Sequence, residues 1–257
     1  MARLKLLVGV TKVLWPEHLN TSYYLDLNRI SRQTRWAHAF MHDYALWLGL
    51  ALMTLTFLAT YVVVWWRRRP QAAGLMFLGG VGTLVALGLN QLVGHAAQEL
   101  RPYDTYPKAL VLVAKAHDYA FPSDHAVVAG ALFTSVLLVV RRAPPLKFAS
   151  GALPRHALAQ PDQRRLSATT FWLAVLGALF GLFLGFARVY VGAHYPGDVV
   201  AGYLLGAVVV MVASGARRAV YWVVGLVLRS PLSWLVCRPG AEGVQGGTSL
   251  PQPALRR

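Results

Sequence analysis

Charged side chains are scarce in this chain of 257 residues: Asp, Glu, Lys and Arg make up 14% of it, while hydrophobic residues make up 56%. A soluble globular domain carries about 25% charged residues. The composition therefore excludes an ordinary soluble domain and indicates a polytopic membrane protein. The single cysteine, Cys237, excludes a disulfide within the chain and a zinc cluster built on cysteine. We interpret it as a small apolar residue near the membrane interface.

Acidic residues are few as well: ten Asp and Glu stand against 25 Lys and Arg, which gives a formal net charge of +15. Such an excess suits a nucleic-acid-binding surface only where the basic residues gather on one face. Here most of them lie in short connections between long apolar runs, as in membrane proteins. We therefore predict no nucleic-acid partner.

Long apolar runs are what the chain has in abundance. Three runs without a charged side chain reach the roughly 20 residues that a helix needs to cross a bilayer: residues 44–66, 72–93 and 167–187. Two shorter runs, 126–140 and 199–216, reach that length if their helices begin near Pro122 and Pro196, because proline suits a first helical turn. The sequence thus predicts an all-α fold, a polytopic membrane helix bundle with five spans.

A sixth span is the alternative for residues 219–237. Arg229 and Pro231 interrupt this stretch and would place a charge and an unmet backbone group in lipid, so we interpret it as a broken interfacial helix. Before the first span, apolar residues recur at helical spacing among basic ones from Leu25 to Met41. That pattern predicts an amphipathic helix on the membrane surface.

The predicted organisation has four parts. An interfacial segment at 1–43 is followed by a transmembrane core at 44–216, an interfacial or sixth membrane helix at 217–239, and a tail at 240–257. The tail is rich in Gly, Pro and Gln, and we expect it to be disordered. The N-terminus lacks a small-residue cleavage site after an apolar core, so we predict no cleaved signal peptide.

The connections differ in charge. The first, third and fifth hold eleven Lys and Arg with one acid, Asp162, whereas the second and fourth hold four basic and five acidic residues. Basic connections are retained on the cytoplasmic side. The sequence therefore predicts a multi-pass protein of the cell membrane whose second and fourth connections face outward.

These two outward connections hold almost every residue able to perform acid, base or anion chemistry: Arg101, Ser123, His125, Arg188, His194 and Asp198. Each has a structural explanation by itself, as a headgroup anchor, a helix start or a solvated side chain. Together, two arginines, a serine at a helix N-terminus and two histidines can form a phosphate site.

The histidines suggest catalysis. His194 is a candidate nucleophile, with Asp198 about one helical turn further on to orient its ring. His125 could then protonate a leaving oxygen. Both would act on a phosphate bound by Arg101, Ser123 and Arg188.

The chain resembles the phosphatidic acid phosphatase type 2 family of integral membrane phosphatases, which is related to the vanadium haloperoxidases. The family signature reads Lys, six residues, Arg-Pro; then Pro-Ser-Gly-His; then Ser-Arg, five residues, His, three residues, Asp. Across residues 72–216 this sequence offers Arg101-Pro102, then Pro122-Ser123-Asp124-His125, then Arg188, His194 and Asp198.

Three positions depart from that signature. Gly94 replaces the lysine, which removes a cation whose contact in a transition state can be worth several kcal/mol. His95, Gln91 or Lys115 could take its place; alternatively the chain is a weak or inactive relative. Ala187 replaces the serine. Asp124 replaces the glycine, is counted among the phosphate-binding residues, and resembles the Pro-Ser-Asp-His variant of bacterial undecaprenyl-diphosphate phosphatases.

The resemblance implies a phosphatase that needs no metal or cofactor and acts at the outer leaflet through a phosphohistidine on His194. The expected substrate is undecaprenyl diphosphate or a similar polyprenyl diphosphate. Phosphatidic acid and phosphatidylglycerol phosphate are alternatives. Two other functions are also alternatives. One is a lipid-phosphate binding or transport protein, although a binder has no need of His194 paired with Asp198. The other is a vanadate-dependent haloperoxidase. The sequence carries no signal for the oligomeric state.

Overall fold

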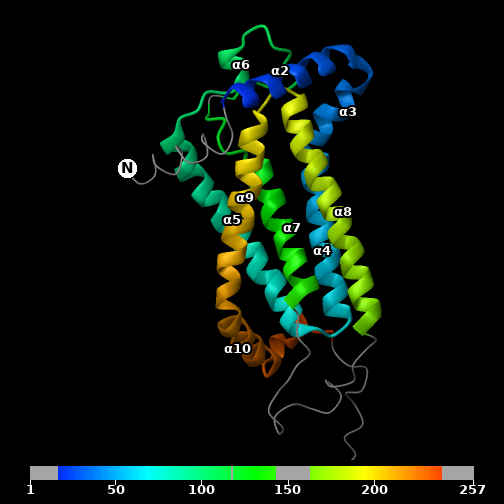
Figure 1. The fold of residues 1–257 in the computed structure, drawn as a ribbon. Coiled ribbons are helices and arrows are strands. Elements are labelled where there is room, and N and C mark those ends of the chain that lie inside the picture. Colours follow the sequence, from blue (N-terminus) through cyan, green and yellow to red (C-terminus); the bar gives the residue numbers. More distant parts are fainter. Residues whose placement is uncertain (1–16, 117, 143–162, 239–257) are drawn as a thin grey trace, which may run out of the picture.

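The computed structural model describes residues 17–116, 118–142 and 163–238. Within these ranges every regular element is helical, as Figure 1 shows. The prediction of an all-α membrane bundle is confirmed. The N-terminal residues before Glu17 and the predicted tail from Gly240 lie outside the described residues.

Five long helices build the bundle: α4 (Gly49–Trp66), α5 (Pro70–Ala97), α7 (Asp124–Arg142), α8 (Gln163–Tyr190) and α9 (Pro196–Ala213). Four helical stretches are long and apolar enough to cross a membrane, namely Arg35–Trp66, Pro70–Thr105, Ala168–Tyr190 and Pro196–Leu228. Helix α7 is a shorter apolar helix. These helices contain the five predicted spans, and Pro196 begins α9 as its fixed φ angle favours.

The first span begins earlier than the sequence predicted. A turn of 3₁₀-helix (Arg35–Ala37), α3 (His38–Asp43) and a π-helical turn, η2 (Tyr44–Leu48), lead directly into α4. Residues 35–41, which the sequence predicts to be part of the amphipathic helix, therefore belong to the helical stretch that continues into α4. The amphipathic helix ends earlier, at Gln33, and the hydroxyl of the next residue, Thr34, donates to the carbonyl of Ile30 at 2.8 Å.

That separate helix, α2 (Glu17–Gln33), lies across one end of the bundle, called the α2 end below (Figure 1). It buries Tyr24, Asn28 and Ser31 against the protein and leaves Leu25 and Ile30 exposed. Asn28 exchanges two hydrogen bonds with the backbone of Leu110, at 2.7 and 3.0 Å. The connection between α6 (Pro102–Thr105) and α7 is therefore fastened beneath α2.

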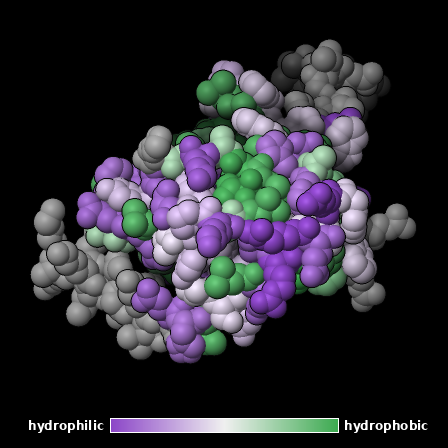
Figure 2. All heavy atoms as spheres, turned by 90° about the horizontal axis from the view of Figure 1, so that it is seen from above, coloured by the Kyte–Doolittle hydropathy of each residue, from purple (hydrophilic) through white to green (hydrophobic). Residues whose placement is uncertain are grey.

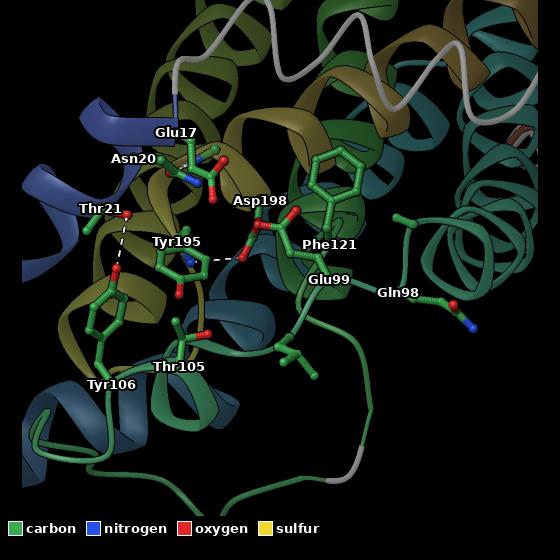
Figure 3. Close-up of a pocket in the computed structure, with 13 residues that line it drawn as sticks. Glu17, Asn20, Thr21, Gln98, Glu99, Thr105, Tyr106, Phe121, Tyr195 and Asp198 are labelled. Atoms are coloured by element: carbon green, nitrogen blue, oxygen red, sulfur yellow. Dashed lines mark hydrogen bonds between the residues drawn. The ribbon is translucent and has the colours of Figure 1, made fainter.

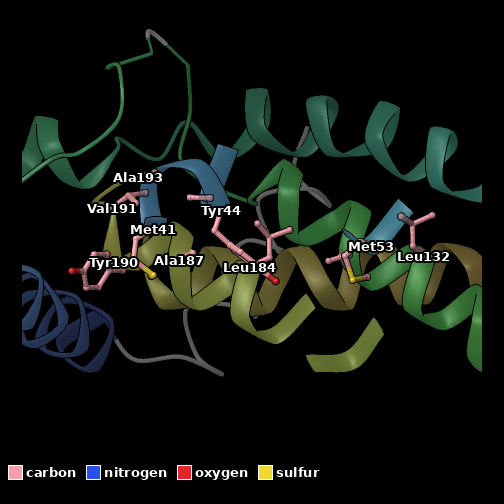
Figure 4. Close-up of a cluster of buried hydrophobic side chains, with 11 residues drawn as sticks. Met41, Tyr44, Met53, Leu132, Leu184, Ala187, Tyr190, Val191 and Ala193 are labelled. Atoms are coloured by element: carbon pink, nitrogen blue, oxygen red, sulfur yellow. The ribbon is translucent and has the colours of Figure 1, made fainter. Parts of the chain in front are cut away.

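Apolar packing holds α4, α7 and α8 together (Figure 4). Met53, Leu132 and Leu184 are buried in one cluster along these helices. Large apolar side chains on the bundle flank are exposed instead, including Leu84 at 69% and Leu92 at 64%. Exposure of so many apolar side chains suits a surface that contacts lipid.

Helices α7 and α9 approach so closely that their backbones touch. A Cβ on Gly206 would lie 2.1 Å from the carbonyl oxygen of Val127, and one on Gly202 would lie 2.7 Å from that of Ser123. Only glycine leaves room for this approach, as in other membrane helix pairs with small residues four positions apart. The start of α7 is thereby pressed against the first turns of α9.

The opposite end is closed by α10 (Arg217–Leu228) and a short 3₁₀-helix, η5 (Pro231–Leu235). The 12 residues of α10 are fewer than a span requires. Trp65 Nε1 donates to the Trp234 carbonyl at 2.6 Å, so η5 folds back against the end of α4. Helix α10 stops just before Arg229 and Pro231, the residues that interrupt the apolar run.

Seen onto the α2 end, the molecule presents mostly hydrophilic side chains around a small apolar patch (Figure 2). This face contrasts with the apolar flank. The distribution suits a bundle whose α2 end meets water.

Candidate active site

The three sequence motifs meet at the α2 end. Arg101 precedes α6, and Ser123 to His125 lie at the start of α7. Arg188 is in the last turn of α8, and the turn from α8 to α9 carries His194. Residues far apart in the sequence are thus brought to one place by the ends of four helices.

A tight turn after α8 brings His194 back over Arg188. Gly192 adopts φ +82°, a left-handed conformation that side chains disfavour, and the Ala193 amide bonds to the Arg188 carbonyl at 3.1 Å. As a result, His194 Nε2 lies 3.1 Å from one guanidinium nitrogen of Arg188. It lies 3.4 Å from a guanidinium nitrogen of Arg101.

The other ring nitrogen of His194 has a backbone partner. Nδ1 lies 2.8 Å from the carbonyl oxygen of Ala120. A carbonyl can only accept, so Nδ1 carries the proton and the lone pair is on Nε2, which faces the two arginines. The imidazole is therefore held in the tautomer that a nucleophile requires.

Burial and charge keep this imidazole neutral. His194 is 2% exposed, and its pKa is lowered well below the usual value, first by burial and then by the positive charges of Arg188 and Arg101. A neutral ring retains the lone pair needed for attack.

Asp198 lies next to His194 but bonds elsewhere. Its Oδ2 is 3.6 Å from His194 Nδ1, beyond an ordinary hydrogen bond, and accepts from the Tyr195 amide at 2.8 Å to cap α9. The hydrogen bond that orients the His194 ring, which the sequence predicts for Asp198, is made by the Ala120 carbonyl in this structure. A backbone carbonyl leaves no trace in residue identity, so the sequence offered no signal for it.

Arg188 and His125 both form hydrogen bonds with the backbone of the π-helical turn η2. One nitrogen of Arg188 donates to the Ala45 carbonyl at 3.4 Å, and His125 forms a hydrogen bond with the backbone of Leu46. A π-turn shifts the hydrogen-bond register of a helix, and such turns are frequent at functional sites. Nothing in the sequence points to Ala45 or Leu46, because both lie inside a long apolar run.

Arg101 is held by an acidic partner that the sequence reading missed. Its Nε donates to Asp118 at 2.6 Å, and another nitrogen donates to the Ala193 carbonyl at 3.1 Å. Arg101 is only 7% exposed, whereas Asp118 is exposed. These bonds fix the guanidinium plane beside His194.

Two donors of the cluster lack partners within the described residues. The Ser123 hydroxyl and Arg188 Nε are both buried and unpaired. A buried donor without a partner is unfavourable by about 1–3 kcal/mol, so such groups commonly await a ligand. Phosphate oxygens could accept from both.

The remaining predicted residues lie on the α5 side. Asp124 accepts from Asn90 and Gln91, so its carboxylate faces α5. His95 is exposed, with Nδ1 2.8 Å from the Gln91 carbonyl and its ring against Tyr119.

Lys115, another candidate for the missing cation, lies over the Tyr103 ring at 5.6 Å. Neither it nor His95 has a recorded contact with His194 in the described part of the chain.

A separate cavity of about 350 Å³ lies behind Asp198, between α2, the end of α5 and the start of α9 (Figure 3). Glu17, Glu99 and Asp198 line it, and its described lining includes no Lys or Arg. Three carboxylates disfavour an anion. An anion such as phosphate therefore fits the arginine and histidine cluster better than this cavity.

The fold and the cluster together define a class: a membrane-embedded helical protein with two buried arginines beside a histidine. Residues 74–222, more than half of the chain, match the PAP2 superfamily, and the chain belongs to this family. The family supports a phosphatase.

Two relatives are named for a lipid diphosphate. An undecaprenyl-diphosphatase of Sulfolobus acidocaldarius is 24% identical over 139 residues, 54% of this chain and 52% of that protein. Undecaprenyl-diphosphatase BcrC of Bacillus subtilis is 28% identical over 176 residues, 68% of each chain. The match thus spans about half of the archaeal relative.

A solved structure shares the fold. The transmembrane PAP2 type phosphatidylglycerolphosphate phosphatase of Bacillus subtilis superposes with a TM-score of 0.56 at 17% identity, covering 85% of this chain and 96% of that one. The fold of a PAP2 membrane protein is therefore shared.

Proposed function

We propose that this protein is a phosphatase of the extracytoplasmic leaflet that hydrolyses undecaprenyl diphosphate or a similar polyprenyl diphosphate. One observation carries the proposal: the unprotonated Nε2 of His194 faces the guanidinium groups of Arg101 and Arg188. A phosphoryl group held by those donors would have its phosphorus in front of a nucleophile. The names of the relatives support the choice of substrate.

In the first step, Arg101, Arg188 and the Ser123 hydroxyl bind the terminal phosphate. His194 Nε2 forms a bond to phosphorus while the bond to the bridging oxygen breaks, and that oxygen leaves with the electron pair on the polyprenyl phosphate. His125 gives a proton to the leaving oxygen. The product on the enzyme is a phosphohistidine.

In the second step, water attacks the phosphohistidine. His125 accepts a proton from the water, the P–N bond breaks, and inorganic phosphate leaves with His194 restored to its neutral form. We propose that no metal takes part, because guanidinium groups supply the charge that stabilises the phosphoryl oxygens.

A second candidate is a phosphatase of phosphatidylglycerol phosphate, favoured by the shared fold of the Bacillus subtilis protein with that name. The test is phosphate release by purified protein in detergent with EDTA, offered undecaprenyl diphosphate, phosphatidic acid and phosphatidylglycerol phosphate in parallel. We expect undecaprenyl diphosphate to have the highest kcat/KM. Release from none of the three would refute the proposed function, and loss of release with EDTA would refute metal independence.

The side of the membrane is tested separately. The charge asymmetry of the connections favours an outward α2 end. A cysteine introduced at Lys108 should react with an impermeant thiol reagent on intact cells, and one at Arg155 should not, both in a Cys237→Ala background. The opposite labelling would place the chemistry in the cytoplasm.

A further inference from the structure

The carboxylate of Asp124 is one of the positions at which this chain departs from its family pattern, and it is fixed by two amide side chains. Asn90 Nδ2 donates to Asp124 Oδ1 at 2.6 Å, and Gln91 Nε2 donates to the same oxygen at 3.0 Å. An ionised carboxylate only accepts hydrogen bonds. Asp124 therefore cannot hold a phosphate as a donor, and its side chain serves another purpose.

Asn90 also bonds to the residue on the other side of Ser123. Its Nδ2 lies 3.1 Å from the Pro122 carbonyl oxygen. The amide thus uses both of its N–H groups on the two neighbours of the serine that has the unpaired hydroxyl. Asn90 is 3% exposed, and its place within an apolar helix makes these interhelical bonds costly to lose.

Gly94, another departure from the family pattern, lies one helical turn after Asn90 in α5. A Cβ on Gly94 would lie 3.3 Å from the carbonyl oxygen of Phe121, so the loop rests against α5 at this point. Helix α5 therefore contacts Phe121 through Gly94, Pro122 through Asn90, and Asp124 through Asn90 and Gln91. Two of the three departures, Gly94 and Asp124, therefore fall in one contact surface.

We propose that Asn90, assisted by Gln91, is a positioning residue that holds Ser123 and His125 in reacting geometry through Asp124 and Pro122. The glycine of the family pattern has no carboxylate to anchor; here Asp124 ties the start of α7 to α5. The two amides also keep this negative charge turned toward α5 and away from an entering phosphate. The inference rests on the proposed function, since it assigns these residues to its phosphate site.

The test is a double-mutant cycle on the full-length protein: Asn90→Ala, Asp124→Ala and both together, with kcat, KM and thermal midpoint measured for each. Asp124→Asn is the conservative variant, because its amide oxygen can still accept from Asn90. Thr83→Ala is the matched control, since it removes a buried hydrogen bond of the same helix, from the Thr83 hydroxyl to the Gly79 carbonyl at 2.9 Å.

We expect Asn90→Ala to lower kcat about 10- to 100-fold with little change in KM, because a displacement of about 1 Å has effects of that size. Asp124→Ala should behave alike, the double variant should be no worse than the poorer single one, and Asp124→Asn should keep most of the activity. Thr83→Ala should lower the thermal midpoint but not kcat. Additive losses, or an Asn90→Ala protein with wild-type kcat, would overturn the proposal.

A readout without turnover separates this proposal from the proposed function. Orthovanadate, which imitates pentacoordinate phosphorus, should raise the thermal midpoint of the wild-type protein and raise it less for Asn90→Ala. If the wild type released no phosphate from any lipid but showed this difference, the proposed function would fail and the positioning role would stand. An equal vanadate shift in wild type and Asn90→Ala would overturn the positioning role alone.

Discussion

Two sides of the candidate site are built differently. The α8–α9 side, residues 188–198, holds Arg188, His194 and Asp198 within eleven positions and keeps each of these family residues. The α5 side has lost the family lysine at Gly94 and offers amide groups and a close backbone contact instead. One side supplies charge and the nucleophile, and the other supplies shape. Loss of the nucleophile on the α8–α9 side should therefore stop the reaction, while changes on the α5 side should slow it.

The largest expected effect is that of His194→Ala. Removal of the nucleophile should lower phosphate release at least about ten-thousandfold, as for other residues that act as a catalytic unit. His95→Ala is the matched control on the α5 side, because His95 is exposed and bonds to its own helix. Activity of His194→Ala comparable with wild type would contradict both the assignment of the nucleophile to the α8–α9 side and the proposed mechanism.

His125→Ala should follow, with a loss that depends on the leaving group. An alcohol leaving group needs a proton more than a phosphorylated lipid does, so we expect about a 100-fold loss with phosphatidic acid and about tenfold with undecaprenyl diphosphate. Equal losses with the two substrates would show that His125 is not the acid.

Asp198→Asn should have an intermediate effect. The amide oxygen can still cap α9 by accepting from the Tyr195 amide, and Ala120 still holds the imidazole tautomer, so only the ionisable carboxyl group is lost. We expect kcat to fall about 10- to 100-fold, less than the roughly 10⁴-fold loss that follows when the equivalent change in a catalytic triad leaves the wrong tautomer. A loss as large as that of His194→Ala would indicate that Asp198, and not Ala120, orients the ring during the reaction.

The pH dependence of stability gives a smaller signal from the α8–α9 side. In the unfolded chain His194 binds a proton below about pH 6.5. In the folded protein its pKa is lower because of burial and the neighbouring arginines, so it stays neutral there. The unfolded state then binds more protons, and stability should fall as the pH drops below about 6.5. The thermal midpoint of His194→Gln should depend less on pH between 7.5 and 5.5; an unchanged dependence would contradict the lowered pKa.

The smallest effect belongs to Gly94. Gly94→Ala should lower kcat about two- to tenfold, because the new Cβ presses on the Phe121 carbonyl, and Gly94→Lys should bring no gain. Gly88→Ala is the control on the same helix, since a Cβ there meets nothing within 4 Å. A higher turnover in Gly94→Lys would show that the α5 side lacks a cation and not merely a different shape.

The sequence by itself determined the spans and the chemistry-bearing residues of this protein. Apolar runs of spanning length and the spacing of Arg101, His125, Arg188 and His194 are properties of consecutive residues, so they can be read without a fold. The end of the amphipathic helix at Gln33 could not be predicted, because apolar residues keep a helical spacing from Leu25 to Met41, across the turn at Thr34.

The tertiary structure alone decided which partners hold those residues. Ala120 orients His194, the π-turn carbonyls of Ala45 and Leu46 receive Arg188 and His125, and Asn90 holds Asp124. Backbone carbonyls are the same in every residue, so residue identity does not show which of them will accept a hydrogen bond. The Asn90 amide lies on an apolar helix, and its partner is decided only when another helix packs against it. Their role depends on how closely the helices pack, and that distance is set by contacts between residues far apart in the chain.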